Sequence, residues 1–478
     1  MTRRSQIALV ALASAAGAAH AAPGFQITPI AADILLREDL RLNLPAELSR
    51  FGVAGLGDID INDAGQVIFD FSGFVYPPGS DEPVGHNGVW YGSAEGGAPI
   101  VFAPDSEIGL FVGGPAINNA GVGVWSHSQP VSLWRRNTDG TIQNLGNIPL
   151  NAVQSYQTLD LTDDGRIAGR MTLGLTVWAI IDPSQNFPFN YVEIESADDA
   201  PIFFLFTPSV NSSGTFAGKV QLVDNDGDPF NPPPVEIRVY SGPGTYTTIA
   251  QNVALDPSST FRNFDNSIGF ADDGSVVFYA RSDAADTVQL YRGGQLVTVA
   301  TEGQDNIASF GTRAPSVTSD GSVYFDAKLA NAPAETDFVI FRWRDGELTQ
   351  VLREGDPLTI NGAPFEFGFS DPTQQAIGSG AIANNNGVFA INIAVRPRAG
   401  EPGASATGGE AIVIVSESDE PECPADFDGN GAVNVNDLLG FLGAFRTQDA
   451  SSDFDGNGVV NVNDLLGFLG AFRNGCPA

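Results

Sequence analysis

The stretch INDAGQVIF, residues 61–69, decides the fold, because variants of it recur along the chain. In each variant an apolar residue precedes Asn, Asp, Thr or Ser positions, a turn residue that is usually glycine, and alternating apolar residues. Asn, Asp and Gly tolerate the positive φ of tight turns, and period-two alternation is typical of strands with one buried face. The phrase therefore predicts a β-hairpin.

Seven copies of this phrase define a tandem repeat. Their turn glycines are Gly65, Gly121, Gly165, Gly214, Gly274, Gly321 and Gly387. A second hairpin follows, with an aromatic residue near its start, as in the segments that begin at Val89, Leu133, Leu290 and Phe341. Two hairpins in roughly 50 residues form a four-stranded antiparallel unit, which is the repeat of a propeller blade. We therefore expect a mainly β fold with a seven-bladed β-propeller-like body; an open β-solenoid is the alternative, which this period disfavours.

The two ends of the repeat region indicate how the ring closes. The seventh unit ends in a single strand, residues 411–418, that has no partner within the unit. Residues 25–40 resemble residues 349–358 of the sixth unit. We expect the N-terminal strand to complete the last blade and to cover its edge.

Composition limits the partners. The chain has 478 residues and a formal net charge of −34, from 57 acidic and 23 basic residues. Its length favours more than one domain. A surface this negative repels phosphate backbones and anionic lipid headgroups and attracts divalent cations. We expect no nucleic-acid partner.

The N-terminus predicts export. Arg3 and Arg4 precede an apolar run over residues 7–17 and an A-x-A cleavage site, Ala19 to Ala21. Residues 1–21 therefore read as a signal peptide. The run is too short to cross about 30 Å of hydrocarbon. We expect a secreted, extracellular protein, associated with the cell surface and without membrane insertion.

The propeller region carries no positive signature of catalysis. His86 and His127 lie in glycine- or serine-flanked stretches that we expect to be loops, and nucleophile-elbow, zinc-protease and phosphate-loop motifs are missing from the sequence. We interpret the Asn and Asp residues of the phrase as turn formers. The tryptophans of the hairpins are interpreted as blade packing: Trp90, Trp134, Trp178 and Trp343. A carboxylate pair for glycoside hydrolysis stays open, because such residues meet only in the fold.

The C-terminal region predicts two calcium sites. DFDGNGAVNVNDLLGFLGAFR, residues 426–446, recurs 27 residues later with one change, Ala432 to Val459. Each copy matches a 12-residue EF-hand-like loop, in which alternating oxygen ligands wrap a calcium ion and position 7 offers a backbone carbonyl. The predicted ligands of the first loop are Asp426, Asp428, Asn430, Ala432, Asn434 and Asp437. Those of the second are Asp453, Asp455, Asn457, Val459, Asn461 and Asp464.

One helix is expected after each loop. An apolar stripe runs along the first helix: Val435, Leu438, Leu439, Leu442 and Phe445, widened by Phe441. Gly440 and Gly443 weaken that helix and would allow the two helices to approach closely. Because such short helices are marginal alone, calcium binding should couple to folding. Cys423 and Cys476 bracket the pair, and export permits a disulfide between them.

The region from Cys423 to Cys476 resembles a type I dockerin of the kind that ends in Gly-Cys, here Gly475 and Cys476. Asp at loop position 12, in place of the Glu of an EF-hand, fits that family. The resemblance implies a cohesin-like or other surface receptor, met at loop positions 10 and 11. These positions are Val435, Asn436, Val462 and Asn463, which are not the Ser-Thr pairs common in the family.

The body resembles secreted bacterial repeat proteins marked by an NxxG…F phrase, matched best by Asn62, Gly65 and Phe69. The expected domains are a signal peptide (1–21), a propeller (22–415), a linker (416–422) and an all-α dockerin-like domain (423–478). We expect the tail to anchor a binding or structural module. The dockerin resemblance makes a glycoside hydrolase acting on polysaccharide the alternative.

Overall fold

The structure is a computed structural model of the chain. The structure describes residues 25–33, 39–40, 51–77, 79–109, 112–128, 131–147, 155–172, 176–184, 191–197, 201–224, 231–360, 362–369, 377–398, 400–401, 403, 408–417, 425–427, 433–454 and 460–474.

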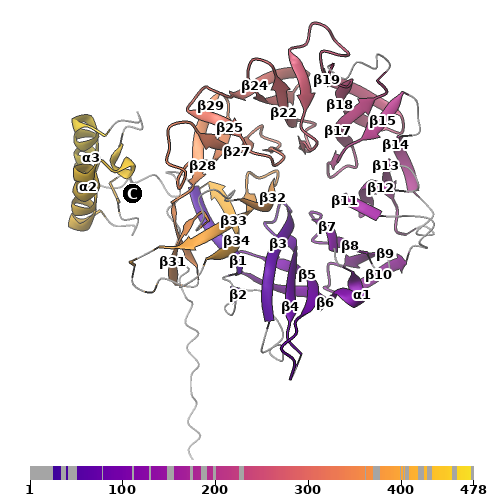
Figure 1. Ribbon diagram of the computed structural model, residues 1–478, viewed down its shortest axis with the longest axis horizontal. Coiled ribbons are helices and arrows are strands. Elements are labelled where there is room, and N and C mark those ends of the chain that lie inside the picture. The colour runs from indigo at the N-terminus through magenta and orange to yellow at the C-terminus, as the bar shows by residue number, and fades with distance from the viewer. Residues whose placement is uncertain are drawn as a thin grey trace, which may run out of the picture.

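Seven β-sheets stand around a central axis, so the body is a seven-bladed β-propeller, as the repeat predicted (Figure 1). Blade 1 contains β3 (Phe51–Ile61), β4 (Val67–Val75), β5 (Val84–Ser93) and β6 (Gly96–Pro104), and the short helix α1 (Asp105–Ile108) follows it. Blade 2 contains β7 (Val112–Ile117), β8 (Gly123–Ser128), β9 (Val131–Arg136) and β10 (Ile142–Asn147). Blade 3 contains β11 (Ser155–Leu161), β12 (Ile167–Thr172), β13 (Thr176–Ile181) and β14 (Tyr191–Ser196).

The innermost strand is interrupted in the next three blades. Blade 4 contains β15 (Ile202–Leu205) and β16 (Ser209–Val210), then β17 (Phe216–Leu222), β18 (Val235–Gly242) and β19 (Thr245–Gln251). Blade 5 contains β20 (Phe261–Phe264) and β21 (Gly269–Phe270), then β22 (Val276–Ser282), β23 (Thr287–Arg292) and β24 (Gln295–Thr301). Blade 6 contains β25 (Ile307–Phe310) and β26 (Ser316–Val317), then β27 (Val323–Leu329), β28 (Phe338–Arg344) and β29 (Glu347–Arg353).

Blade 7 joins the two ends of the propeller. It contains β32 (Ile377–Ala383), β33 (Phe389–Pro397) and β34 (Gly409–Glu417), with the N-terminal strand β1 (Phe25–Asp33) antiparallel to β34. The register runs from Phe25 opposite Glu417 to Asp33 opposite Glu410. The predicted closure by the N-terminal strand is confirmed. β2 (Asp39–Leu40) adds to β1, and β30 (Pro357–Ile360) and β31 (Ala363–Phe367) form a hairpin beside β33.

Hydrophobic side chains fill the interfaces between adjacent blades. Because side chains alternate across each strand, every blade buries residues on both faces. Trp178 of blade 3 packs against Phe216 of blade 4, with ring centroids 6.5 Å apart. Tyr324 of blade 6 stacks on Phe389 of blade 7 at 4.8 Å. Trp90 and Trp178 are fully buried, and Trp134 and Trp343 pack against the cores, so their interpretation as blade packing is confirmed.

The repeated phrase forms the turn that follows each innermost strand. Gly65 has φ of +73°, in the left-handed region that glycine adopts without strain. The Asn62 side chain accepts the N–H groups of Ala64 and Gln66, and its Nδ2 donates to the carbonyl of Asn118 in blade 2. Asn384 of blade 7 donates to the carbonyl of Asn62 in the same way. The phrase therefore builds both the turns and the bonds that join neighbouring blades at the axis.

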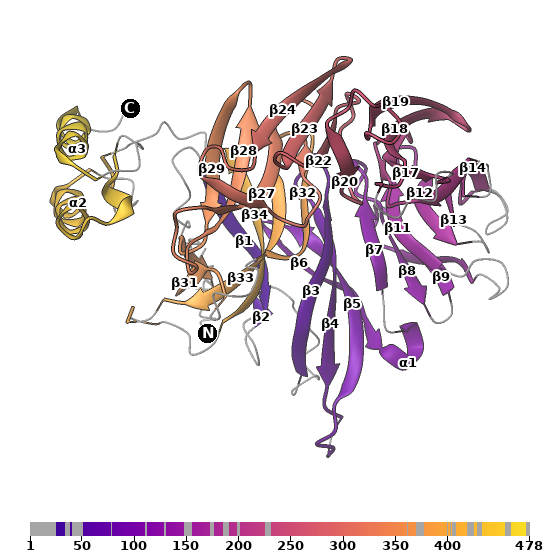
Figure 2. The same cartoon turned by 45° about the horizontal axis from the view of Figure 1, so that its top comes forward.

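Two helices of the C-terminal region lie outside the ring (Figure 2). They are α2 (Val435–Thr447) and α3 (Val462–Asn474), with a short 3₁₀ helix, η1 (Ala450–Ser452), between them. Among the described helices, none is long and apolar enough to cross a membrane.

Candidate functional site

Four phenylalanines form the core of the C-terminal module. Phe441 of α2 and Phe468 of α3 are fully buried, and their rings stack with centroids 4.0 Å apart. Phe427 meets Phe441 edge-on at 5.5 Å, and Phe454 meets Phe468 edge-on at 5.8 Å. Each loop ring also contacts the helix ring of the other half. The ring centroids are 6.1 Å apart for Phe427 and Phe468 and 6.2 Å apart for Phe454 and Phe441. The two halves of the module are thus related by a pseudo-two-fold axis.

Both helices begin with the same network of hydrogen bonds. The carboxylate of Asp437 accepts the N–H of Asn434 at 2.7 Å, and the Asn434 side chain accepts the N–H of Asn436 at 2.9 Å. Asp464, Asn461 and Asn463 repeat these two distances in the second half. This capping box satisfies N–H groups that a helix start leaves open. Asp437 and Asp464 are fully buried, so each places a carboxylate inside its half of the module.

Only some of the predicted calcium ligands lie in residues that the structure describes. Asp426, Asn434 and Asp437, with Asp453, Asn461 and Asp464, lie in described residues. Asp428, Asn430, Ala432, Asp455, Asn457, Val459, Cys423 and Cys476 lie outside them. Within the described residues no group of three His, Cys, Asp or Glu side chains could hold a metal. The described members nevertheless fit calcium, because each half buries a carboxylate where loop position 12 should contribute one, and hard oxygens are the ligands that calcium prefers.

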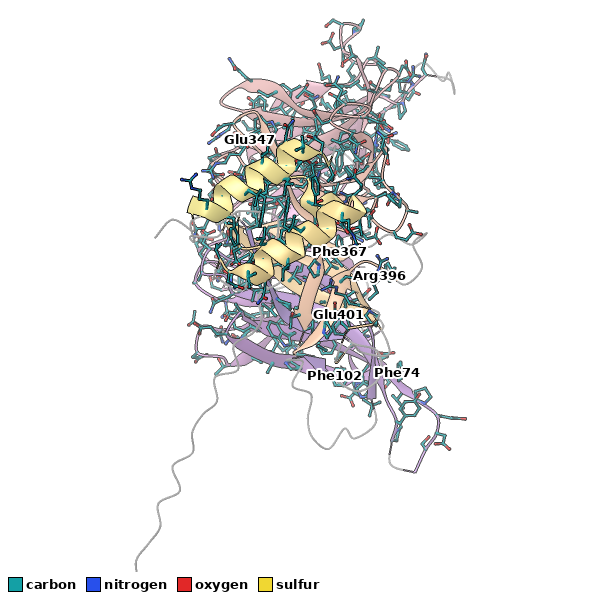
Figure 3. The ribbon with its side chains drawn as sticks, turned by 90° about the vertical axis from the view of Figure 1, so that its left-hand side faces the viewer. Phe74, Phe102, Glu347, Phe367, Arg396 and Glu401 are labelled. Atoms are coloured by element: carbon teal, nitrogen blue, oxygen red, sulfur yellow. The ribbon has the colours of Figure 1, made fainter. Side chains whose placement is uncertain are left out.

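The apolar stripe of the first helix is divided between the core of the module and its surface. Leu439 is 62% exposed and Leu466 is 63% exposed, and Val435, Leu442, Val462 and Leu469 are exposed as well. The loop ring of Phe427 packs edge-on against Phe441. Figure 3 shows α2 and α3 side by side on one side of the protein. Each helix therefore presents an apolar face, which includes the predicted partner residues Val435 and Val462; Asn436 and Asn463 are exposed beside them.

The glycines of the first helix have different roles. A Cβ on Gly440 would lie 3.0 Å from Cδ1 of Phe427, and one on Gly467 would lie 2.8 Å from Cδ1 of Phe454. A Cβ on Gly443 would meet nothing within 4 Å. The prediction that these glycines bring the helices together is wrong: Gly440 and Gly467 make room for a ring of their own loop.

A second candidate site lies on the propeller axis, where the turns of the repeat meet. The cavity there has a volume of about 120 Å³. Its walls carry five carboxyl groups, those of Asp60, Asp63, Asp160, Asp163 and Asp272. Asp63, Asp163 and Asp272 accept the backbone N–H of Asn385, Asn119 and Ser212 in other blades. Most of these carboxyl groups therefore accept hydrogen bonds between blades, a role that the turn-forming interpretation of the phrase did not include.

Asp60 and Asp160 have perturbed acidities. Burial raises the pKa of Asp60 to about 6, although the N–H groups of Ile117 and Ile61 partly oppose the shift. Burial, helped by the charge of Asp60, raises the pKa of Asp160 well above its ordinary value, and the N–H of Val210 opposes it. Both shifts favour retention of a proton by the pair.

The analysis of the sequence missed this pair. Both residues stand five positions before a turn glycine, Gly65 for Asp60 and Gly165 for Asp160. That shared offset was a usable signal, because it places both side chains at the end of an innermost strand.

The histidines lie on strands, so the expectation that they occupy loops is wrong. His86 belongs to β5 and His127 to β8. His127 is buried, and its Nε2 accepts the indole N–H of Trp125 at 3.1 Å. Burial lowers the pKa of His127 to about 4, so the ring is neutral and packs as part of the core.

Comparison with known proteins gives a family. The model of a family of unknown function, DUF7453, matches residues 205–462, which is more than half of the chain. No curated protein matches the sequence.

Three solved structures illustrate the similarity in fold. The acylaminoacyl peptidase of Pyrococcus horikoshii is 13% identical, with a TM-score of 0.42 over 72% of this chain and 58% of that one. A virginiamycin B lyase from Staphylococcus aureus with quinupristin is 12% identical, with a TM-score of 0.38 over 82% and 100%. YCF48 bound to D1 peptide is 9% identical, with a TM-score of 0.39 over 84% and 99%. This chain thus spans less than two thirds of the peptidase.

Proposed function

This chain belongs to DUF7453, a family of unknown function, and we propose that it is an exported calcium-binding protein whose dockerin-like tail attaches the propeller to a receptor. The receptor is a cohesin-like or other protein at the cell surface or in an extracellular matrix. The propeller is the part that the tail attaches, and it acts as a binding or structural module.

One observation carries the proposal: two equivalent apolar faces are exposed on a module of this size. Val435, Leu439 and Leu442 on α2 correspond to Val462, Leu466 and Leu469 on α3. Exposed apolar patches of this kind mark interaction sites. Because the halves repeat each other, a receptor that fits one face should also fit the other after a half-turn.

Calcium would be held by the two predicted ligand sets, and it would supply the counter-charge for their carboxylates. Asp437 and Asp464 are buried, and each stands at loop position 12, where a calcium loop contributes a carboxylate. The ion would also fix each loop against the helix that follows it. Receptor binding should therefore require calcium.

The test is binding of the chain from residue 22 onward to a purified type I cohesin and to cell-envelope extract, with calcium or with chelator. We expect calcium-dependent retention that the double variant Leu439→Lys, Leu466→Lys loses. Leu296→Lys is the matched control, because Leu296 is an exposed leucine on β24 of the propeller. Retention that survives chelation, or that the double variant keeps, would overturn the proposal.

The Asp60–Asp160 pair favours a second candidate function, extracellular glycoside hydrolysis. A protonated acid beside an ionised one is the arrangement that this reaction uses. The measurement is release of reducing ends from a panel of polysaccharides by the chain and by Asp160→Asn. Activity lost in Asp160→Asn but kept in Asp139→Asn, an exposed turn residue, would establish the enzyme. Inactivity of the unaltered chain on the whole panel would exclude it for those substrates.

A further inference from the structure

A polar side chain stands five residues after each turn glycine, on the second strand of each blade. The set is Asp70, Ser126, Arg170, Lys219, Tyr279, Asp326 and Asn392. Donors at this position reach the next blade. Lys219 Nζ donates to the carbonyl of Phe264 at 2.7 Å, and Asn392 Nδ2 donates to the carbonyl of Leu56 at 2.8 Å. The Tyr279 hydroxyl donates to Asp326 at 3.2 Å.

Arg170 departs from this pattern. Its Nε is buried and has no hydrogen-bond partner among the described residues. Its guanidinium lies over the ring of Phe204 in blade 4, with Cζ 4.9 Å from the ring centroid. Burial lowers the pKa of Arg170, and no described carboxylate opposes the shift. A half-buried guanidinium without a counter-ion is unfavourable, and it is unexpected in a chain with a net charge of −34.

The surroundings of Arg170 are aromatic and cationic. Phe204 packs edge-on against Phe206 at 4.8 Å, and Lys219 Nζ lies 4.2 Å from the centroid of Phe206. Two cations therefore flank one pair of phenylalanine rings. Lys219 donates hydrogen bonds to neutral oxygens, those of Phe264 and Asn266, and the charge of Asp265 acts on it as well. Phe203, next to Phe204, is 62% exposed. Two cations thus contact the aromatic residues of this segment, and the residue before Phe204 is exposed.

We propose that Arg170 and the adjoining phenylalanines bind a carboxylate-bearing ring, specifically a uronic-acid unit of a polysaccharide. The guanidinium of Arg170 would hold the carboxylate, since its fork of N–H groups matches that geometry. Phe203 would cover the apolar face of the sugar ring. Lys219 adds charge without direct contact, because it is buried. The inference gives the propeller a ligand class and does not depend on the tail.

The test is calorimetric titration of the chain from residue 22 onward with galacturonate, galactose and acetate. We expect galacturonate to bind at least ten-fold more tightly than either galactose or acetate. Arg170→Gln should weaken galacturonate at least ten-fold, and Arg170→Lys should weaken it less. Arg262→Gln is the control, because Arg262 forms an exposed ion pair with Asp283. If galactose binds as tightly as galacturonate, the carboxylate is not recognised. If acetate binds as tightly, the sugar ring is not recognised. If Arg170→Gln leaves galacturonate affinity unchanged, Arg170 is not the binding site.

Thermal unfolding of Arg170→Met provides a second readout, which separates binding from a structural role. Without ligand the variant should melt at or above the temperature of the unaltered chain, because it removes an uncompensated charge. Galacturonate should raise the melting temperature of the unaltered chain and not that of the variant. A variant that melts lower without ligand, together with no shift of the unaltered chain by galacturonate, would make Arg170 a structural residue and end the proposal.

Discussion

The rings of Phe441 and Phe468 stack face to face between α2 and α3, with their planes within 2° of each other. This contact joins the two halves of the C-terminal module, and the edge-on rings of Phe427 and Phe454 close it on both sides. The stability of the module therefore depends on these four rings.

Phe441→Ala should unfold the C-terminal module and leave the propeller intact. Truncating a fully buried phenylalanine costs about 3–5 kcal/mol, which a module of this size cannot absorb. The measurement is the helical circular dichroism signal at 222 nm in calcium. Leu439→Ala, at an exposed position of the same helix, is the control and should change stability by less than about 0.5 kcal/mol. An equal loss of the 222 nm signal in both variants would contradict the burial of Phe441 in the module core.

Gly440→Ala should destabilise the module although alanine is the better helix former. Its Cβ would lie 3.0 Å from Phe427, so the ring would have to shift. Gly443→Ala meets no neighbour and should stabilise the same helix by about 0.5–1 kcal/mol. Chemical unfolding of the two variants side by side measures the difference. If both alanine variants stabilise the module, the contact between residue 440 and the Phe427 ring does not limit its stability.

Removal of calcium should melt α2 and α3 without affecting the blades. Asp437→Asn combined with Asp464→Asn should lower calcium affinity at least about ten-fold, because it removes a carboxylate from each predicted site. Calcium titration followed by circular dichroism measures this. Asp449→Asn, at an exposed position between the helices, is the control. Helices that persist in chelator, with the affinity of the double variant unchanged, would exclude the calcium sites.

The propeller should be more stable in weak acid than at neutral pH. Burial raises the pKa of Asp60 and Asp326 to about 6 and that of Asp70 to about 7, from 3.8. The native state therefore holds more protons than the unfolded state between about pH 4 and pH 7. The stabilising contribution is complete below the unfolded pKa and is lost as the pH rises through the native values.

Melting temperatures from pH 5 to pH 8 test this expectation, and they should fall as the pH rises. Asp70→Asn should stabilise the propeller at pH 8 by about 2 kcal/mol, because Oδ1 of Asp70 is buried without a hydrogen-bond partner. The exposed control Asp139→Asn should have little effect. A melting temperature that rises towards pH 8 would contradict the raised pKa values of these buried aspartates.

The sequence was a good guide wherever local chemistry determines the structure. A turn glycine such as Gly65 needs positive φ, and its neighbours alternate, so the blades and their number could be predicted. The closure by β1 could be predicted because one unit lacked a strand. The Asp60–Asp160 pair was missed because its members come from blades 1 and 3 and meet only when the ring forms.

The apolar stripe of α2 shows a different limit. Helical periodicity identifies apolar residues on one side of a helix, but it does not show which of them another segment will cover. Phe427 comes from the loop and covers Phe441, which leaves Leu439 exposed. Periodicity alone therefore did not show that Leu439 is exposed.

The position of β34 has a mechanical consequence. This strand ends at Glu417, directly before the tail, and it lies inside its sheet between β33 and β1. Arg342 and Arg344 of blade 6 also pair with Glu417. If the tail is tethered and the body is dragged by flow, the load enters β34 along its length. The hydrogen bonds to both neighbours would then be sheared together, instead of being peeled apart one at a time. The pairing of β1 with β34 thus closes the ring and also strengthens the strand that would carry the load from the tail.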